Sequence, residues 1–169
     1  MNKMLNPVND DGNPIDLVED LASANTWRYN RVSDNDLQIT IPSKWSELTM
    51  FVTWQDEFSA LLIACQISSL QTPSELELAM SDLLQDINQK LWLGHFDLSE
   101  ERKTPTFRYT CLMRHMDAVA CLGNIEDVFD VTLDEIERFY PAIQMICAGQ
   151  VHHNRETLST AMLQPIGEA

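Results

Sequence analysis

The sequence predicts an α+β domain in which helices pack on one face of an antiparallel sheet. Two observations carry this prediction. Apolar residues recur at helical spacing in two long segments, and they alternate with polar residues at a period of two in several short ones. The predicted order is helix, four strands, helix, two strands, long helix and short helix. Because the first four strands follow one another closely, an antiparallel meander is the simplest pairing.

The first half of the chain carries a short helix and then the strand signals. Asn13 and Pro14 have the character of an N-cap and a first-turn proline, and the helix is predicted to reach about Ala24. Strands are predicted over 27–32, 37–41, 48–54 and 58–67. The last of these is nearly all apolar, which is typical of a strand covered on both faces.

A second helix is predicted from Thr72 to about Trp92. Thr72 and Glu75 have the spacing of a capping box, Pro73 takes the first helical position, and Gly94 follows the end. Its apolar residues recur at steps of three and four, as the buried stripe of an amphipathic helix does.

The remaining elements are two strands and two helices. Short strands are predicted over 95–98 and 107–113, and a long helix is predicted to start near Asn124. Pro141 interrupts that helix, so a kink or break is expected between 134 and 141 because the proline ring clashes with a carbonyl of the preceding turn. A last short helix is predicted over 156–163.

The chain has 169 residues, which suits one domain of ordinary size. Residues 1–12 are predicted to form a flexible arm, 13–165 the single domain and 166–169 a C-terminal tail. The hydrophobic content of 44% is typical of a soluble globular protein that can bury its own core.

The net charge of −15 restricts the possible partners. It excludes nucleic acid and anionic membrane surfaces, because both are bound through clustered Lys and Arg. Two readings remain, a soluble acidic surface or a surface for a partner with basic segments.

The chain has no apolar run of about 20 residues and no signal-peptide pattern, so a cytoplasmic location is expected. Four cysteines, none in a C-x-x-C pair, are expected to be reduced and mostly packed as small apolar groups: Cys65, Cys111, Cys121 and Cys147.

Motifs of catalysis are missing from the sequence. It contains no glycine-rich phosphate loop and no metal-spaced Cys/His set, so we expect no cofactor, no metal and no enzyme. If the chain were an enzyme, His95, Asp97 and His115 would be the first suspects. His152 and His153 are neighbours, which is a poor arrangement for chelation on a helix and favours an exposed pair.

Two groups of residues are candidates for partner binding. One is an acidic helix face that could meet a basic partner or simply offset the helix dipole; it contains Glu126, Asp127, Asp130, Asp134, Glu135 and Glu137. The other is aromatic and consists of Trp45, Trp54 and Phe58. Trp45 lies in a predicted loop beside Lys44, where it could anchor an interface or fold back as a lid on the core.

Several strings resemble the YbjN family, a bacterial family described as sensory transduction regulators. They are Leu91-Trp92-Leu93-Gly94-His95-Phe96-Asp97-Leu98, Glu137-Arg138-Phe139-Tyr140-Pro141-Ala142 and Ile166-Gly167-Glu168-Ala169. The opening Pro14–Glu19 and the region of Trp45 fit as well, so the likeness covers most of the chain from about Asn13. The signature residues are Trp92, Gly94, His95, Phe96, Asp97, Phe139, Tyr140 and Pro141.

The resemblance implies a fold similar to the class I chaperones of type III secretion, which commonly form homodimers. It carries no catalytic residues. The connection over 114–123 departs from the polar or glycine-rich loop that the family pattern implies.

Three functions follow. The first is a non-enzymatic protein-binding or regulatory module, a homodimer of the kind used in bacterial signalling or stress regulation. The alternative is a secretion-type chaperone that holds an extended client, and the third is a small enzyme of unknown reaction. In the first, an amphipathic helix would pair across the dimer, and apolar sheet or groove surface left open by the fold would hold a partner segment.

Overall fold

A computed structural model describes residues 12–99 and 103–150 of the chain. In chain order the elements are α1 (Pro14–Ala24), β1 (Arg28–Ser33), β2 (Asp36–Pro42), β3 (Glu47–Gln55), the 3-10 turn η1 (Asp56–Phe58), β4 (Ala60–Gln66), the 3-10 turn η2 (Ser74–Leu76), α2 (Glu77–Asn88), β5 (His95–Leu98), β6 (Pro105–Leu112) and α3 (Ala118–Cys147). The predicted order is confirmed over these residues. The N-terminal arm before Gly12, the last short helix (156–163), His152, His153 and the tail (166–169) lie outside them.

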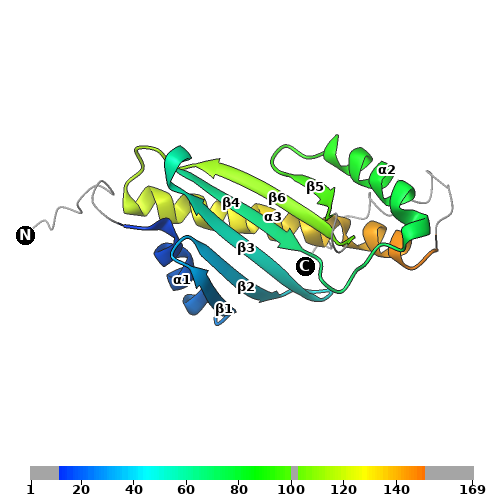
Figure 1. The fold of residues 1–169 in the computed structure, drawn as a ribbon, viewed down its shortest axis with the longest axis horizontal. Coiled ribbons are helices and arrows are strands. Elements are labelled where there is room, and N and C mark those ends of the chain that lie inside the picture. Colours follow the sequence, from blue (N-terminus) through cyan, green and yellow to red (C-terminus); the bar gives the residue numbers. More distant parts are fainter. Residues whose placement is uncertain (1–11, 100–102, 151–169) are drawn as a thin grey trace, which may run out of the picture.

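The strands form one six-stranded sheet in the order β1-β2-β3-β4-β6-β5, and every neighbouring pair is antiparallel. The predicted α+β class and the meander of the first four strands are therefore confirmed. Figure 1 shows the sheet with α3 running behind it along the long axis of the molecule. The helices of the described chain cover one face of the sheet and leave the other open.

The core lies between the covered face and α3. Alternate residues of the central strands point into it, for example Ile39, Met50 and Ile63 in adjacent strands. The helix contributes a stripe of large side chains at helical spacing, including Phe129 and Phe139, which are almost completely buried. Burial of this apolar area is the main favourable term in the stability of such a domain.

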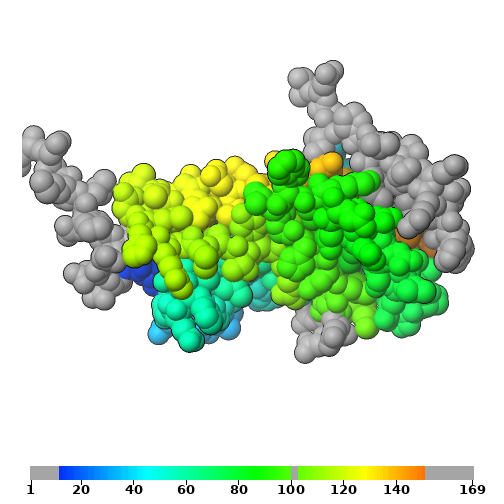
Figure 2. Space-filling model, turned by 90° about the horizontal axis from the view of Figure 1, so that it is seen from above, coloured from blue at the N-terminus to red at the C-terminus, as the bar shows by residue number. Residues whose placement is uncertain are grey.

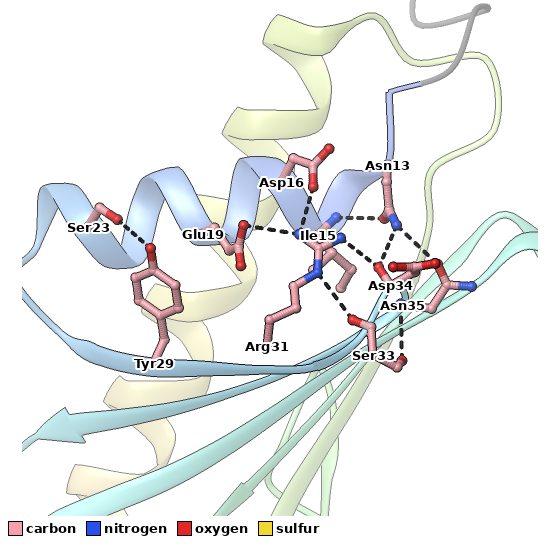
Figure 3. A network of polar contacts seen from close by, with 10 residues as sticks. All are labelled: Asn13, Ile15, Asp16, Glu19, Ser23, Tyr29, Arg31, Ser33, Asp34 and Asn35. Atoms are coloured by element: carbon pink, nitrogen blue, oxygen red, sulfur yellow. Dashed lines mark hydrogen bonds and ion pairs between the residues drawn. The ribbon is translucent and has the colours of Figure 1, made fainter.

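A polar network fastens α1 to the turn between β1 and β2 (Figure 3). Arg31 donates to the carboxylates of Asp16 (2.7 Å) and Glu19 (3.0 Å) and to the carbonyl of Asp34 (2.7 Å). As predicted, Asn13 is the N-cap of α1: its Oδ1 accepts from the backbone N–H of Ile15, while its Nδ2 donates to the Asp34 carbonyl. One side chain therefore caps the helix and ties it to the hairpin.

The prediction that the fourth strand is covered on both faces is wrong. Leu61, Ile63 and Cys65 of β4 are buried against the helices, but Leu62 points to the open face and is 36% exposed. Leu62 and Ala64 make the sequence of the strand apolar throughout, although these two residues stand on a face that no helix of the described chain covers.

The second helix differs from its prediction at both ends. The chain around Thr72 does not form a capping box, because η2 comes first and no side chain caps either η2 or α2. Thr72 is instead buried. The helix ends at Asn88 rather than near Trp92.

The third helix starts earlier than predicted and is longer. It begins at Ala118, with the Asp117 carboxylate accepting from the N–H of Ala120, so most of the unusual 114–123 stretch belongs to the helix and its cap. Of the kink or break predicted near Pro141, the break is wrong, since α3 continues to Cys147. Buried side chains on both sides of the proline, Tyr140 and Ala142 among them, hold the helix in place although Pro141 has no N–H to donate.

An asparagine covers one edge of the sheet. β5 is an edge strand, and the outward N–H of Phe96 donates to Asn88 Oδ1 (2.7 Å) while its carbonyl accepts from Asn88 Nδ2 (2.9 Å). The amide thus takes the place of a neighbouring strand. Figure 2 shows α2, in green, beside this part of the molecule. Edge strands that keep free backbone groups invite pairing with other chains, so this cap closes the β5 edge.

Gly94 occupies a position that no other residue fits. It has φ +68°, and a Cβ there would lie 2.3 Å from Phe107 Cζ and 2.8 Å from the Arg108 carbonyl oxygen. The chain must approach β6 this closely to bring Phe96 into the core.

Replacement of Gly94 by Ala should therefore lower the free energy of unfolding by about 3 kcal/mol or more, since left-handed strain and overpacking add together. The matched control is Gly123→Ala in α3, where a new Cβ meets no atom within 4 Å. That change should be neutral or stabilise by about 0.5–1 kcal/mol through helix propensity. Urea denaturation followed by circular dichroism measures both, and equal effects of the two changes would contradict the assignment.

Replacement of Asn88 by Ala should cost about 2–3 kcal/mol, because it removes two hydrogen bonds to the Phe96 backbone. Asn88→Asp should be no better, since a carboxylate oxygen would face the Phe96 carbonyl. The control is Gln85→Ala on the exposed side of α2, expected to lie within about 0.5 kcal/mol of the wild type. Full stability of Asn88→Asp in denaturation experiments would show that the edge needs no cap.

Candidate protein-binding surfaces

The two signature strings near 91–98 and 137–142 meet in the core. Phe96 packs edge-to-face on Phe139, with ring centroids 6.2 Å apart, and on Phe107 at 5.0 Å. Asp97 accepts from Arg108 Nε at 2.5 Å in the neighbouring strand. These contacts give most of the signature a structural role, which is to dock β5 on β6 and α3.

The predicted aromatic candidates do not form one patch. Trp45 lies in the β2–β3 turn and stacks on Tyr140, with centroids 5.5 Å apart and planes 4° from parallel. Trp54 and Phe58 lie at the opposite end of β3, and Trp54 Nε1 donates to the Asp56 carboxylate. Of the two readings of Trp45, the contact supports the lid, although 42% of the residue stays exposed.

A groove opens between α2 and β5. Its volume is about 450 Å³, and it is lined by Ser81, Leu84, Gln85, Asn88, Gln89, Phe96, Asp97 and Leu98. The apolar residues belong to both elements, and the polar ones are mostly uncharged amides and a hydroxyl. This composition, apolar surface with a few hydrogen-bonding groups, is typical of a binding site for a small ligand or a short peptide segment.

Trp92 lies in the connection between the two walls of this groove, and 98% of its surface is exposed. The adjacent Leu93 is 48% exposed, and Leu78 at the start of α2 is 73% exposed. A tryptophan so open to water is unusual, because tryptophan is strongly buried on average. Exposed tryptophans are also the residues most enriched among the energetic centres of protein interfaces.

The open face of the sheet carries a second apolar feature. Phe51 lies opposite Ala64 and Leu62 lies opposite Thr110, so the registers place Phe51, Leu62 and Leu112 on one diagonal across β3, β4 and β6. We call these three residues the apolar stripe. Leu112 is 60% exposed. Ser59 accepts from the N–H of Met113, which places Phe58 beside the β6 end of the stripe.

Charge is divided between the two sides of the molecule. The three helices contain twelve carboxylates and one arginine, a net charge of −11. On the open face, by contrast, two arginines stand against three carboxylates, a net charge of −1. The predicted acidic face of the long helix is part of the first side, with Glu126, Asp127, Asp130 and Asp134 exposed.

The charged groups of the open face pair among themselves. Arg28 contacts Glu47 at 2.5 Å, and Arg108 contacts Asp97 at the same distance. Hydrogen bonds from the hydroxyls of Ser33 and Thr53 lower the pKa of Asp36. These contacts leave the open face with little uncompensated charge.

Two of the three groups suspected of catalysis lie on one face of β5, His95 opposite Arg108 and Asp97 bonded to Arg108 Nε. His115 is not brought to them, since it follows the far end of β6, beyond Leu112. Burial raises the pKa of the thiols of Cys65, Cys111, Cys121 and Cys147, which makes each a poorer nucleophile. No metal-binding cluster of His, Cys, Asp or Glu occurs among residues 12–99 and 103–150. Within the same ranges, every helix is too short or too polar to cross a membrane.

These features define a class of protein: an acidic α+β domain with a sheet covered on one side and exposed apolar surface at two places. The chain belongs to the YbjN family. The model of that family, described as "Putative bacterial sensory transduction regulator", matches residues 14–145. A search of curated proteins found no match. The resemblance stated from the signature strings is thereby confirmed, and the family is described as a regulator rather than an enzyme.

Sequence reasoning missed both apolar surfaces as sites. Trp92 stood out only as part of a signature, because its exposure depends on where α2 ends. Leu62 looked like a core residue, because its strand is nearly all apolar, whereas Leu112 fell on the side of its strand that alternation marks as polar, with Arg108 and Thr110. The register between β4 and β6, which links strands separated by α2 and β5, places them on one face.

Proposed function

We propose that this chain is a non-enzymatic regulatory module of bacterial signalling or stress regulation that works as a homodimer. Each copy binds a segment of a protein partner in the groove between α2 and β5. The observation that carries the proposal is Trp92, 98% exposed at the junction of the two elements that form the groove. Binding would bury this side chain, and the groove beside it supplies apolar surface for the rest of the segment.

The groove suits a peptide segment better than a reaction. Leu84, Phe96 and Leu98 offer apolar contacts to side chains, and the amides of Gln85 and Gln89 can bond to a peptide backbone. Among the described residues that line the groove, Asp97 alone is charged, and it is already paired with Arg108. A site of this kind selects by shape and apolar pattern, which is what a regulator needs to recognise a partner.

The proposal predicts that a photo-crosslinker placed at Trp92 captures the partner. With p-benzoylphenylalanine at position 92, irradiation of living cells should yield a defined heteromeric adduct whose crosslinked peptide comes from one protein. The same group at Val119, which is 63% exposed at the start of α3, is the matched control and should not yield that adduct.

Once the partner is purified, Trp92→Ala should weaken its binding by tenfold or more, as the loss of an interface anchor does. The stability of the free protein should change by less than about 0.5 kcal/mol, because the side chain packs on little. Equal capture from both positions, or unchanged affinity of Trp92→Ala, would contradict docking at the groove.

A further inference from the structure

We infer that a second copy of this chain docks on the open face of the sheet, with the apolar stripe at the centre of the contact. This inference rests on the homodimer of the proposed function and gives it an interface. The groove between α2 and β5 lies at the β5 edge of this face. Of its lining residues, Asp97 belongs to the rim of the contact, whereas those of α2 stay available to the partner.

The stripe has the geometry of an interface centre. Phe51, Leu62 and Leu112 are diagonal neighbours in adjacent strands, about 7 Å apart at that register. The small side chains of Ala60 and Ala64 stand beside them, so the leucines project from a flat surface. Leu62 and Leu112 are 36% and 60% exposed, and a partner surface would remove this apolar area from water.

The surroundings of the stripe are polar and carry little net charge. Hydroxyls on the same face, such as those of Thr40, Thr49 and Thr110, can bond to groups of a facing surface. The charged groups at the rim are the pairs Arg28–Glu47 and Arg108–Asp97, each neutral as a pair. An apolar centre with a polar rim is the usual anatomy of an interface between proteins.

The distribution of charge over the two sides of the molecule favours a second copy as the occupant of the open face. It also disfavours a contact between the helical sides of two copies. Arg31 and Lys103 pair with carboxylates of α1 and α2, which reduces the net charge of the helical side to about −9. Two copies that met through their helices would bring two such charges together, and like charges cost free energy at close range. The open face, with a net charge of −1, is the side on which a chain of net charge −15 can meet itself with little repulsion. A strongly basic partner would gain little electrostatic attraction from the open face, because the carboxylates that attract it lie on the helices.

Two-fold symmetry fits the stripe. In a symmetric dimer the same patch lies on both sides, so the stripe of one copy would cross the stripe of the other. Strand spacing and rise give the face dimensions of roughly 24 Å by 20 Å. Two such faces would bury roughly 1,000 Å² in total, which is the size of weak and transient interfaces, so the dimer should dissociate on dilution.

Analytical ultracentrifugation over a range of protein concentrations tests this. The wild type should show a monomer–dimer equilibrium, and Leu62→Glu and Leu112→Glu should each weaken the dimer by tenfold or more. Val119→Glu places the same charge on a residue of α3 that is about as exposed as Leu112, and it should leave the dissociation constant within about twofold. Because the helical charges repel at longer range, added salt should tighten the dimer slightly.

Circular dichroism shows whether each variant folds, and Leu62→Ser and Leu112→Ser give a milder test without a new charge. They should weaken the dimer in the same direction. A dimer that persists in all four folded variants would overturn the inference and leave the homodimer with another interface. A wild type that stays monomeric would overturn both the interface and the homodimer, while crosslinking from Trp92 would still test the groove.

Discussion

The structure depends on one helix. Three aromatic contacts from distant parts of the chain meet on α3: Trp27 before β1 stacks on Phe129, Phe96 of β5 packs on Phe139, and Trp45 of the β2–β3 turn stacks on Tyr140. Strand pairing alone would leave the sheet free to twist and slide over its core. Contacts near the middle of the helix and toward its C-terminus fix the sheet in position, and α1 and α2 then pack beside α3 as well as against the strands.

Because one layer of helices does this work, no helix among residues 12–99 and 103–150 covers the other face of the sheet. The two edge strands of the sheet, β5 and β1, differ in how their backbone groups are covered. Asn88 closes the backbone of the β5 edge, whereas β1, within residues 12–99 and 103–150, has no comparable cap. Charged side chains follow the same division, with the acids on the helices and paired or neutral groups on the open face. Surfaces that a partner could reach are therefore distinct in shape, polarity and charge.

Local patterns were enough to predict most of the fold. Period-two alternation predicted the strands, and Asn13 predicted the start of α1. Both predictions succeeded because these features depend on residues close in sequence. Predictions failed where distant contacts decided the outcome. Packing on both sides of Pro141 keeps α3 whole. Leu62 is exposed on a strand whose sequence predicts burial, because no helix of the described chain covers it. The exposed Trp92 and the stripe could not be located from sequence, since both follow from how α2 and β6 are placed in space.

Division of charge also bears on how the two proposed contacts can coexist. A dimer through the sheet would leave both helical layers facing outward, so the acidic side chains of each copy would point away from those of the other. The grooves between α2 and β5 would then lie at the β5 edge of each sheet, each with its own Trp92. Partner binding would bring a segment onto α2, whose charged residues Glu77, Asp82 and Asp86 are all acidic. Segments with basic residues beside their apolar anchors would be favoured there, whereas a second copy would be repelled. The same charge pattern that directs self-association to the sheet would thus reserve the groove for a different protein.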